Sequence, residues 1–296
     1  MDTIREISPA KVNLFLEIVG KRSDGYHEVS TVLQEITLCD RLIFSAQQDG
    51  ITFSSSLSDP LFHKDNLVVR AAQKIKSYFA VKAGVHIELE KNIPIAAGLG
   101  GGSSNAAATL RGLNKLWNLG CHHEQLFLLA KDIGADVPFF LFGGTALCEG
   151  RGEEIIQRFK MAKKYWLVLV YPHLKLFTKD VYQAVKFPLT KGTADISLLL
   201  LSLHKGHINT LSLYNRLEDI VLKKYPILAK MKDDLLTYGA RASLITGSGS
   251  ALFAIAHTEI NATIIQNRFM EKYKRECSSF IVNTVTSLRE EANKWR

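Results

Sequence analysis

The stretch Pro94-Ile95-Ala96-Ala97-Gly98-Leu99-Gly100-Gly101-Gly102-Ser103-Ser104 decides the fold of this chain, and Asn105-Ala106-Ala107 continues it. Four glycines within five positions let the backbone turn its N–H groups inward and approach an anion closely. Apolar residues then recur at helical spacing: Ala106, Leu110, Leu113 and Trp117. The glycines therefore open onto a helix N-terminus, whose unpaired N–H groups and partial positive charge attract phosphate. We expect this loop to bind the phosphates of a nucleoside triphosphate, with Ser103 and Ser104 adding hydroxyl groups.

Two common phosphate loops do not fit this pattern. No Lys-Ser or Lys-Thr pair follows the glycines, which excludes the Walker A loop. No acidic residue is placed to close a dinucleotide-binding βαβ unit. A plain serine-capped turn is the simpler alternative, but one turn needs only one glycine.

The composition is that of a globular enzyme. The 296 residues are 47% hydrophobic and 22% charged, which excludes a mainly disordered chain. No apolar stretch approaches the ~20 residues of a membrane span, and no secretory leader precedes Ser8. The four cysteines lie far apart without a Cys-x-x-Cys pair, so we expect free thiols and, by default, the cytoplasm. The net charge of +8 suits either nucleic acid or a phosphorylated small molecule.

Hydrophobic periodicity predicts strands and helices in both halves of the chain, which indicates an α+β protein. The predicted strands are 10–18, 33–45, 85–89, 139–148 (interrupted by Gly143-Gly144), 166–171, 242–246, 251–256 and 280–285. Besides the helix after the glycine loop, the predicted helices are 66–78 with Asp65 as its N-cap, 124–134, 180–185, 197–203, 223–238 and 260–273. The charged segment 149–154 interrupts apolar sequence and indicates a domain boundary nearby.

Three motifs resemble, in order and spacing, those of the GHMP kinases, the superfamily of galactokinase, homoserine kinase, mevalonate kinase and phosphomevalonate kinase. They are Ser8-Pro9-Ala10-Lys11-Val12-Asn13-Leu14, the glycine loop, and Leu244-Ile245-Thr246-Gly247-Ser248-Gly249-Ser250-Ala251-Leu252-Phe253. The resemblance implies an α+β fold of two domains with a deep cleft between them. Residues 1–155 would form an ATP-binding α/β domain like domain 2 of ribosomal protein S5, and residues 156–296 a ferredoxin-like α+β domain.

A fourth motif, Arg22-Ser23-Asp24-Gly25-Tyr26-His27, resembles one branch of this family. It implies ATP-dependent phosphorylation of the 2-hydroxyl of 4-diphosphocytidyl-2-C-methyl-D-erythritol, in the non-mevalonate route to isoprenoid precursors. One alternative is a homoserine or mevalonate kinase, whose small substrate needs no aromatic site for a base. The other is a nucleic-acid-binding protein, because a related N-terminal fold occurs in ribosomal proteins. The glycine loop, Lys11 and Asp136 argue against it, since RNA binding does not require them.

Phosphoryl transfer to an alcohol needs an aligned hydroxyl, a cation near the γ-phosphoryl group and a group that accepts the proton. Lys11 and Asn13 would face the same side of a strand, which places a cation and an amide together. Asp136 lies among small and apolar residues and could act as a general base if a cation keeps it ionised. The resemblance implies that Lys11 and Asp136 form the catalytic pair. Asp136 either accepts the proton or mainly orients Lys11 and the hydroxyl.

The resemblance also implies the substrate contacts. Tyr26 would stack on the cytosine ring while His27 reads its edge, and Tyr182 would cover the other face. Thr178, Asn13, and Gly247 and Ser248 of the third motif would complete the substrate site. Asn66 and Lys91 would contact the adenine and ribose of ATP, although plain helix-cap and strand-edge roles are equally open.

Magnesium is expected with the ATP phosphates, but the sequence departs from the family at this point. Many members hold Mg²⁺ with an acidic residue on the helix after the glycine loop, where this chain has Asn105 and three alanines. We therefore assign no protein side chain as a metal ligand, and Ser103, Ser104 or waters remain the candidates. We expect a small-molecule substrate, no nucleic acid or membrane partner, and a monomer or homodimer.

Overall fold

The computed structural model describes residues 3–57, 66–186 and 194–286. Its packing divides the chain into two compact units. Unit 1 comprises residues 1–10, 38–93 and 100–143, and unit 2 comprises residues 11–37, 94–99 and 144–296. The two long strands β1 (Thr3–Lys21) and β2 (His27–Gln47) each contribute residues to both units. These units are discontinuous packing groups, so the expected family domains 1–155 and 156–296 stay a prediction.

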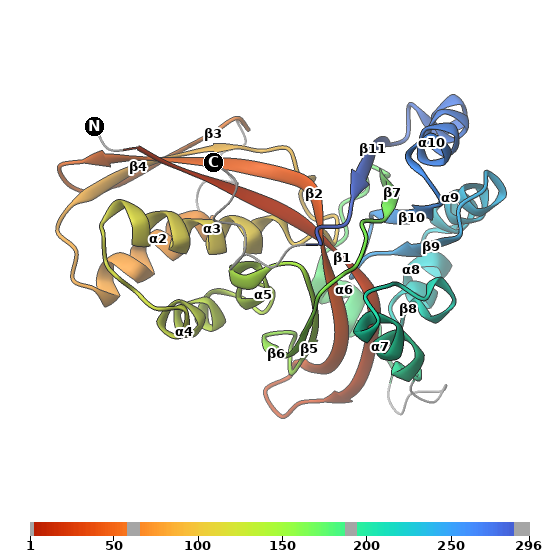
Figure 1. Ribbon diagram of the computed structural model, residues 1–296, viewed down its shortest axis with the longest axis horizontal. Coiled ribbons are helices and arrows are strands. Elements are labelled where there is room, and N and C mark those ends of the chain that lie inside the picture. The colour runs from red at the N-terminus through yellow and green to blue at the C-terminus, as the bar shows by residue number, and fades with distance from the viewer. Residues whose placement is uncertain (1–2, 58–65, 187–193, 287–296) are drawn as a thin grey trace. The chain divides into compact units, whose positions relative to one another are not determined.

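Unit 1 is a layer of strands covered by helices. Strand β4 (Gly84–Glu90) pairs antiparallel with β2 and parallel with β3 (Ile51–Ser55). Val85, Ile87 and Leu89 alternate along β4 and are buried, so one face of the layer is apolar. Helices α2 (Leu67–Tyr78) and α3 (Gly101–Leu116) lie along this layer (Figure 1), and α4 (His123–Ile133) and α5 (Val137–Phe142) complete the unit.

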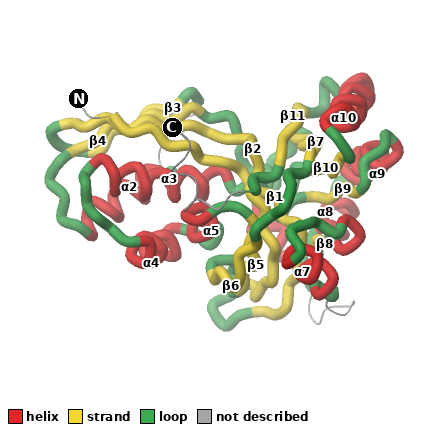
Figure 2. Tube along the Cα trace, in the orientation of Figure 1, coloured by secondary structure: helices red, strands yellow, loops and turns green. Residues whose placement is uncertain are grey.

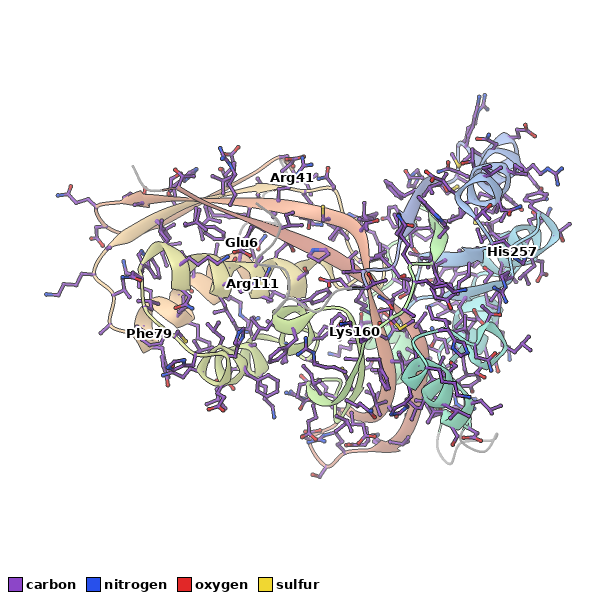
Figure 3. All side chains as sticks on the ribbon, viewed as in Figure 1. Glu6, Arg41, Phe79, Arg111, Lys160 and His257 are labelled. Atoms are coloured by element: carbon purple, nitrogen blue, oxygen red, sulfur yellow. The ribbon has the colours of Figure 1, made fainter. Side chains whose placement is uncertain are left out.

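Helix α3 approaches the strands of unit 1 closely because its core-facing side is made of small residues. Ala106, Ala107 and Ala108 are fully buried, and a β-carbon at Gly112 would lie 2.4 Å from the Phe44 ring. Arg111 Nε and Lys115 Nζ on this helix pair with the buried carboxylate of Glu6, at 3.0 and 2.6 Å. Figure 3 labels Glu6 and Arg111, whose side chains meet beside α3. These contacts fix the helix that begins at the glycine loop.

Unit 2 contains two groups of strands. In the first, β5 (Thr145–Glu149) pairs antiparallel with β2 and with β6 (Glu154–Phe159), and β8 (Tyr214–Asn215) pairs parallel with β1. The second is an antiparallel sheet in the order β11 (Ser278–Asn283), β7 (Trp166–Tyr171), β10 (Leu252–Ala256), β9 (Ala242–Ile245). Strands β7, β10 and β9 are almost uninterrupted runs of buried residues, whereas the edge strand β11 is mostly half-buried.

Helices α9 (Pro226–Thr237) and α10 (Glu259–Tyr273) cover this second sheet. The other helices of unit 2 are α6 (Thr178–Gln183), α7 (Ser197–His204) and α8 (Glu218–Lys224), with the short 3₁₀-helix η1 (Thr210–Ser212). Figure 2 shows α9 and α10 beside strands β9 and β10. Leu228, Met231 and Leu235 of α9 and Ile265 and Phe269 of α10 belong to one buried cluster with the sheet. This cluster anchors the strands that carry the third motif.

The expectation of a strand over 139–148 was wrong in its first half. The structure has helix α5 from Val137 to Phe142, followed by β5. Pro138 stands in the first turn of the helix, where proline is favoured, and Gly143 and Gly144 end it with φ values of +67° and +75°. A short apolar run does not distinguish a strand from a buried helix.

Other boundaries also differ from the sequence prediction. The helical pattern expected over 223–238, with Pro226 as a breaker, belongs to two helices: α8 ends at Lys224, and Pro226 begins α9. The side chain of Asn66 caps α2 by accepting the Val68 N–H at 2.9 Å, whereas Asp65 lies outside the described residues. Strands β3, β6 and β8 were not predicted, and β1 and β2 extend well beyond the predicted ranges.

Candidate active site

The glycine loop has the backbone geometry of an anion-binding loop. Its φ values are +54° at Ala96, +77° at Gly98 and +68° at Gly100, while Ala97 and Leu99 between them are not in this region. Alternating left-handed and ordinary conformations turn successive N–H groups toward one side and form a concave anion site. Gly100 is the N-cap of α3, so the loop opens directly onto the N-terminus of this helix. Phosphate binding by 94–104 stays a prediction that this geometry supports.

The loop contacts both other motifs within unit 2. The N–H of Ala251 donates to the carbonyl of Ala97 at 3.2 Å, and the N–H of Lys11 donates to the carbonyl of Leu99 at 3.0 Å. A β-carbon at Gly98 would lie only 2.2 Å from the carbonyl oxygen of Thr246. The structure therefore brings together three motifs that are separated by up to 240 positions in the sequence.

Lys11 and Asn13 lie side by side on β1, as their spacing predicted. Lys11 Nζ donates to Asn13 Oδ1 at 2.6 Å, and Asn13 Nδ2 donates to Thr31 Oγ1 at 2.9 Å. Their exposed fractions are 4% and 3%, so the ammonium group is held in a nearly dry environment. Coulomb interactions are stronger there than in water, which suits a cation that stabilises a phosphoryl group.

The third motif places a glycine turn against these two side chains. Gly247 has a φ of +55°, and a β-carbon there would lie 3.3 Å from Asn13 Oδ1 and 3.4 Å from Lys11 Nζ. The buried hydroxyl of Thr246 accepts the Asn13 N–H at 3.1 Å. On the other side of the turn, the hydroxyl oxygens of Ser248 and Thr178 are 3.0 Å apart. Asn13, Thr178, Gly247 and Ser248 are therefore neighbours through this turn.

Two of the three expected aromatic contacts also come together in unit 2. The rings of His27 and Tyr182 lie 5.3 Å apart between centroids, tilted by 46°. Burial, reinforced by the charge of Lys21, lowers the pKa of His27, which favours the neutral ring at pH 7. Tyr26 is 58% exposed, and the guanidinium of Arg151 lies 5.3 Å from its ring centre. One face of Tyr26 is therefore covered by Arg151, which the sequence analysis did not single out.

Asp136 belongs to unit 1, where it directly precedes α5 and is half-buried. Asp136 occupies the N-cap position of α5, but its side chain makes no cap hydrogen bond. Because Lys11 belongs to unit 2, the pairing of Lys11 with Asp136 stays a prediction.

The other predicted nucleotide contacts have clear structural roles. Lys91 Nζ is buried, pairs with Asp40 Oδ2 at 2.8 Å and donates to the carbonyl of Ile93. Burial lowers the pKa of Lys91 although Asp40 opposes this shift. Asp40 Oδ1 also accepts the N–H groups of Asn92 and Ile93, both at 2.7 Å. This anchor fixes the segment that enters the glycine loop, and contacts of Asn66 and Lys91 with ATP stay predictions.

The two serines of the loop differ in accessibility. Ser104 is buried, and its hydroxyl lies 2.8 Å from that of Ser8, which donates to Asn105 Oδ1 at 2.6 Å. Ser103 is half-buried and lies in the first turn of α3. Ser103 is thus the better placed of the two for a nucleotide. Ser8 stands in the first motif, but nothing in its sequence context indicated this contact.

The described residues offer neither a clustered metal site nor a membrane-spanning helix. Within the described residues, no group of three or more His, Cys, Asp or Glu side chains could hold a metal ion. In the same part of the chain, no helix is long and apolar enough to cross a membrane.

None of the four cysteines is in a disulfide, as predicted, and burial raises the pKa of Cys277 to about 11. This thiol is therefore protonated and unreactive at neutral pH.

Comparisons with known proteins agree with this geometry. The chain matches the GHMP kinases N terminal domain over residues 66–144 and the GHMP kinases C terminal domain over residues 195–275. It is 42% identical to the 4-diphosphocytidyl-2-C-methyl-D-erythritol kinases of Bacillus anthracis and Bacillus cereus, over 88% of this chain and 90% of each relative.

Solved structures give the same result. The crystal structure of a 4-(cytidine 5′-diphospho)-2C-methyl-D-erythritol kinase superimposes with a TM-score of 0.81 at 33% identity, covering 96% of this chain and 100% of that one. Homoserine kinase from Cytophaga hutchinsonii shares the fold with a TM-score of 0.71 at 17% identity, covering 97% and 95%. The chain belongs to the GHMP kinase family.

Proposed function

We propose that this protein transfers the γ-phosphoryl group of ATP to the 2-hydroxyl of 4-diphosphocytidyl-2-C-methyl-D-erythritol, in the non-mevalonate route to isoprenoid precursors. The observation that carries the proposal is the contact of the glycine loop with the turn at Thr246 and Gly247, beside Lys11 and Asn13. It supports a site where a phosphate chain and a buried cation face the same acceptor. The relatives at 42% identity support the choice of substrate.

In this mechanism the 2-hydroxyl oxygen attacks the γ-phosphorus, and the bond from that phosphorus to the bridging oxygen of ADP breaks. The loop N–H groups and the α3 N-terminus hold the phosphates. Lys11 stabilises the charge on the phosphoryl oxygens, and Asn13 fixes its ammonium group. Asp136 accepts the hydroxyl proton or orients the hydroxyl, because a loose phosphoryl-transfer transition state asks little of a base.

Magnesium would arrive with the nucleotide in this proposal. The described side chains fit such an ion poorly as a dedicated protein site, because Ser104 and Asn105 are engaged with Ser8. Ser103, the half-buried hydroxyl in the first turn of α3, is the side chain that would help to hold the ion. When bound, Mg²⁺ would neutralise charge on the phosphates.

The cytidyl group would bind near His27 and Tyr182. Their tilted pair offers one aromatic face and one ring edge with a neutral imidazole, which can exchange hydrogen bonds with cytosine. Tyr26 can stack only on the face that Arg151 leaves open. Mevalonate and homoserine have no base that could stack in such an aromatic site, so the site favours the cytidyl substrate over those alcohols.

A coupled ADP-release assay with ATP and Mg²⁺ tests the proposal, with the cytidyl substrate, mevalonate and homoserine presented in parallel. We expect turnover only with the cytidyl substrate, abolished by a magnesium chelator and by Lys11→Ala or Asp136→Ala. Turnover on another alcohol would overturn the substrate assignment and leave the kinase activity. ATP binding without ADP release from any alcohol would overturn the proposed reaction itself.

We further propose that the protein acts in the cytoplasm as a monomer or homodimer and binds neither nucleic acid nor membranes. Sedimentation of the purified protein tests the oligomeric state. Retention on RNA or on anionic vesicles at 150 mM salt would contradict the second.

A further inference from the structure

Asn215, at the end of strand β8, is hydrogen-bonded to the glycine turn of the third motif. Its side chain is 4% exposed, and its Nδ2 donates to the carbonyls of Ile245 and Gly247, both at 2.8 Å. Its Oδ1 accepts the N–H of Leu217 at 3.0 Å. The buried amide thus uses both of its protons on the two carbonyls that bracket Thr246.

Glu218, three residues later, contacts the same segment. Its Oε1 accepts the N–H of Ile245 at 2.9 Å, and its Oε2 pairs with Lys232 Nζ at 2.5 Å. Strand β9 pairs with β10 along one edge. At Ile245, the other backbone edge is therefore held by two side chains from the segment 215–218. These contacts leave no buried backbone group of Ile245 unpaired at the point where β9 enters the turn.

The turn depends on these side-chain contacts because its glycine backbone can adopt many conformations. Gly247 and Gly249 have φ values of +55° and +82°, which glycine adopts freely. The position of the turn nevertheless matters on two sides. Gly247 lies against Lys11 and Asn13, and the Ser248 hydroxyl lies 3.0 Å from that of Thr178. A shift of this turn would therefore move the catalytic lysine and the substrate side together.

We propose that Asn215 is a positioning residue for phosphoryl transfer: it holds the carbonyls of Ile245 and Gly247 so that the turn stays aligned with Lys11, Asn13 and Thr178. The proposal rests on the proposed kinase function for its kinetic consequence. Its structural consequence, a turn that loosens when Asn215 is lost, does not depend on the substrate.

The test compares Asn215→Ala with Asn209→Ala. Asn209 lies in the same unit and also holds backbone, since its Oδ1 accepts the N–H of Leu211 at 3.1 Å, but the bond caps η1 and not the turn. Turnover is measured well below the unfolding temperature of each variant and expressed per folded molecule. We expect kcat on the cytidyl substrate to fall ~10-fold or more in Asn215→Ala, since small misplacements of reacting groups have large kinetic effects. Asn209→Ala should retain wild-type kcat.

Hydrogen exchange supplies the readout that needs no substrate. Amides of residues 246–250 should exchange faster in Asn215→Ala than in the wild type and in Asn209→Ala. If the wild type proves inactive on the cytidyl substrate, the proposed function fails, and this comparison alone decides whether Asn215 holds the turn. If Asn215→Ala does not fold, Asn215→Thr, which keeps one donor in a smaller side chain, takes its place.

Two results would overturn the proposal. The first is a folded Asn215 variant with a lower unfolding temperature but wild-type kcat and KM, because this is the pattern of a merely stabilising residue. The second is unchanged exchange at 246–250 in that variant. A fall in kcat together with faster exchange at the turn, absent from Asn209→Ala, supports it.

Discussion

The backbone of Gly98 lies directly against the carbonyl oxygen of Thr246, so that a β-carbon at Gly98 would come within 2.2 Å of that oxygen. No rotamer change can relieve this contact, since both partners are backbone. Gly98 also has a φ of +77°, where other residues are strained. The glycine loop and the third motif can therefore meet only because this position has no side chain.

Gly98→Ala should separate these two motifs. We expect kcat/KM for ATP to fall ~10²-fold or more, because the phosphates and the acceptor lose their alignment. The matched control is Gly120→Ala, which has a φ of +61° but nothing within 4 Å of the added carbon. It carries similar backbone strain without the clash. Steady-state kinetics on both variants check the prediction, and wild-type kinetics in folded Gly98→Ala protein would contradict it.

Asp136→Asn keeps the size of the side chain and removes its charge. If Asp136 accepts the hydroxyl proton, kcat should fall ~10²-fold or more while ATP still binds, as is usual for loss of a general base. Asp132→Asn is the control, because Asp132 is mostly exposed and pairs with Lys74 on the surface of the same unit. ATP affinity and single-turnover rates are measured for both. Near wild-type turnover in Asp136→Asn would rule out the base role.

Tyr182→Leu should weaken binding of the cytidyl substrate. Stacking of a base on an aromatic ring is worth about 1–3 kcal/mol, so KM for this substrate should rise ~5- to 100-fold with KM for ATP unchanged. Tyr78→Leu is the control, because its ring packs on Phe79 in unit 1 and is largely exposed. Equal changes in both KM values would show that Tyr182 supports the fold and not the cytidyl site.

Glu6→Gln should destabilise unit 1 in a pH-dependent way. Burial disfavours the charged carboxylate, but Arg111 and Lys115 outweigh it and hold the pKa of Glu6 below its ordinary value of 4.5. Because the folded pKa is the lower one, ionised Glu6 stabilises the fold above pH 4.5, and this contribution is lost as the pH falls through the lowered pKa.

The variant should therefore lose about 1–3 kcal/mol of unfolding free energy at pH 7, and the difference from wild type should shrink as the pH falls below about 4.5. Urea unfolding at several pH values measures this. Glu90→Gln, which breaks the exposed pair with Arg41, should change the unfolding free energy by less than about 0.5 kcal/mol. A pH-independent difference for Glu6→Gln would contradict the electrostatic explanation.

The sequence predicted best where a pattern has one physical explanation. The structure confirms the left-handed turns that the loop glycines favour, the shared face of Lys11 and Asn13, and the helix predicted beyond the loop, although this helix already begins at Gly101. The apolar run at 139–148 fits a helix and a strand equally well, so periodicity could not place α5.

Contacts between residues that are distant in the sequence could not be predicted from the sequence. The contact of Lys91 with ATP stays a prediction, but nothing in the sequence indicated its ion pair with Asp40, which lies 51 positions away. Asn215 carried no signal at all, since a single asparagine after a tyrosine has no periodicity or motif. Both roles follow from packing between segments that are distant in the chain.

The hydrogen bond from the Asn13 N–H to the Thr246 hydroxyl spans 233 positions, almost the whole chain. During synthesis the turn that completes the surroundings of the first motif is made 233 positions after Asn13. Domains fold as units during synthesis, and a loop of this length closes only when both ends exist. A nascent chain should therefore lack the capacity to use ATP until the segment around Thr246 has been made.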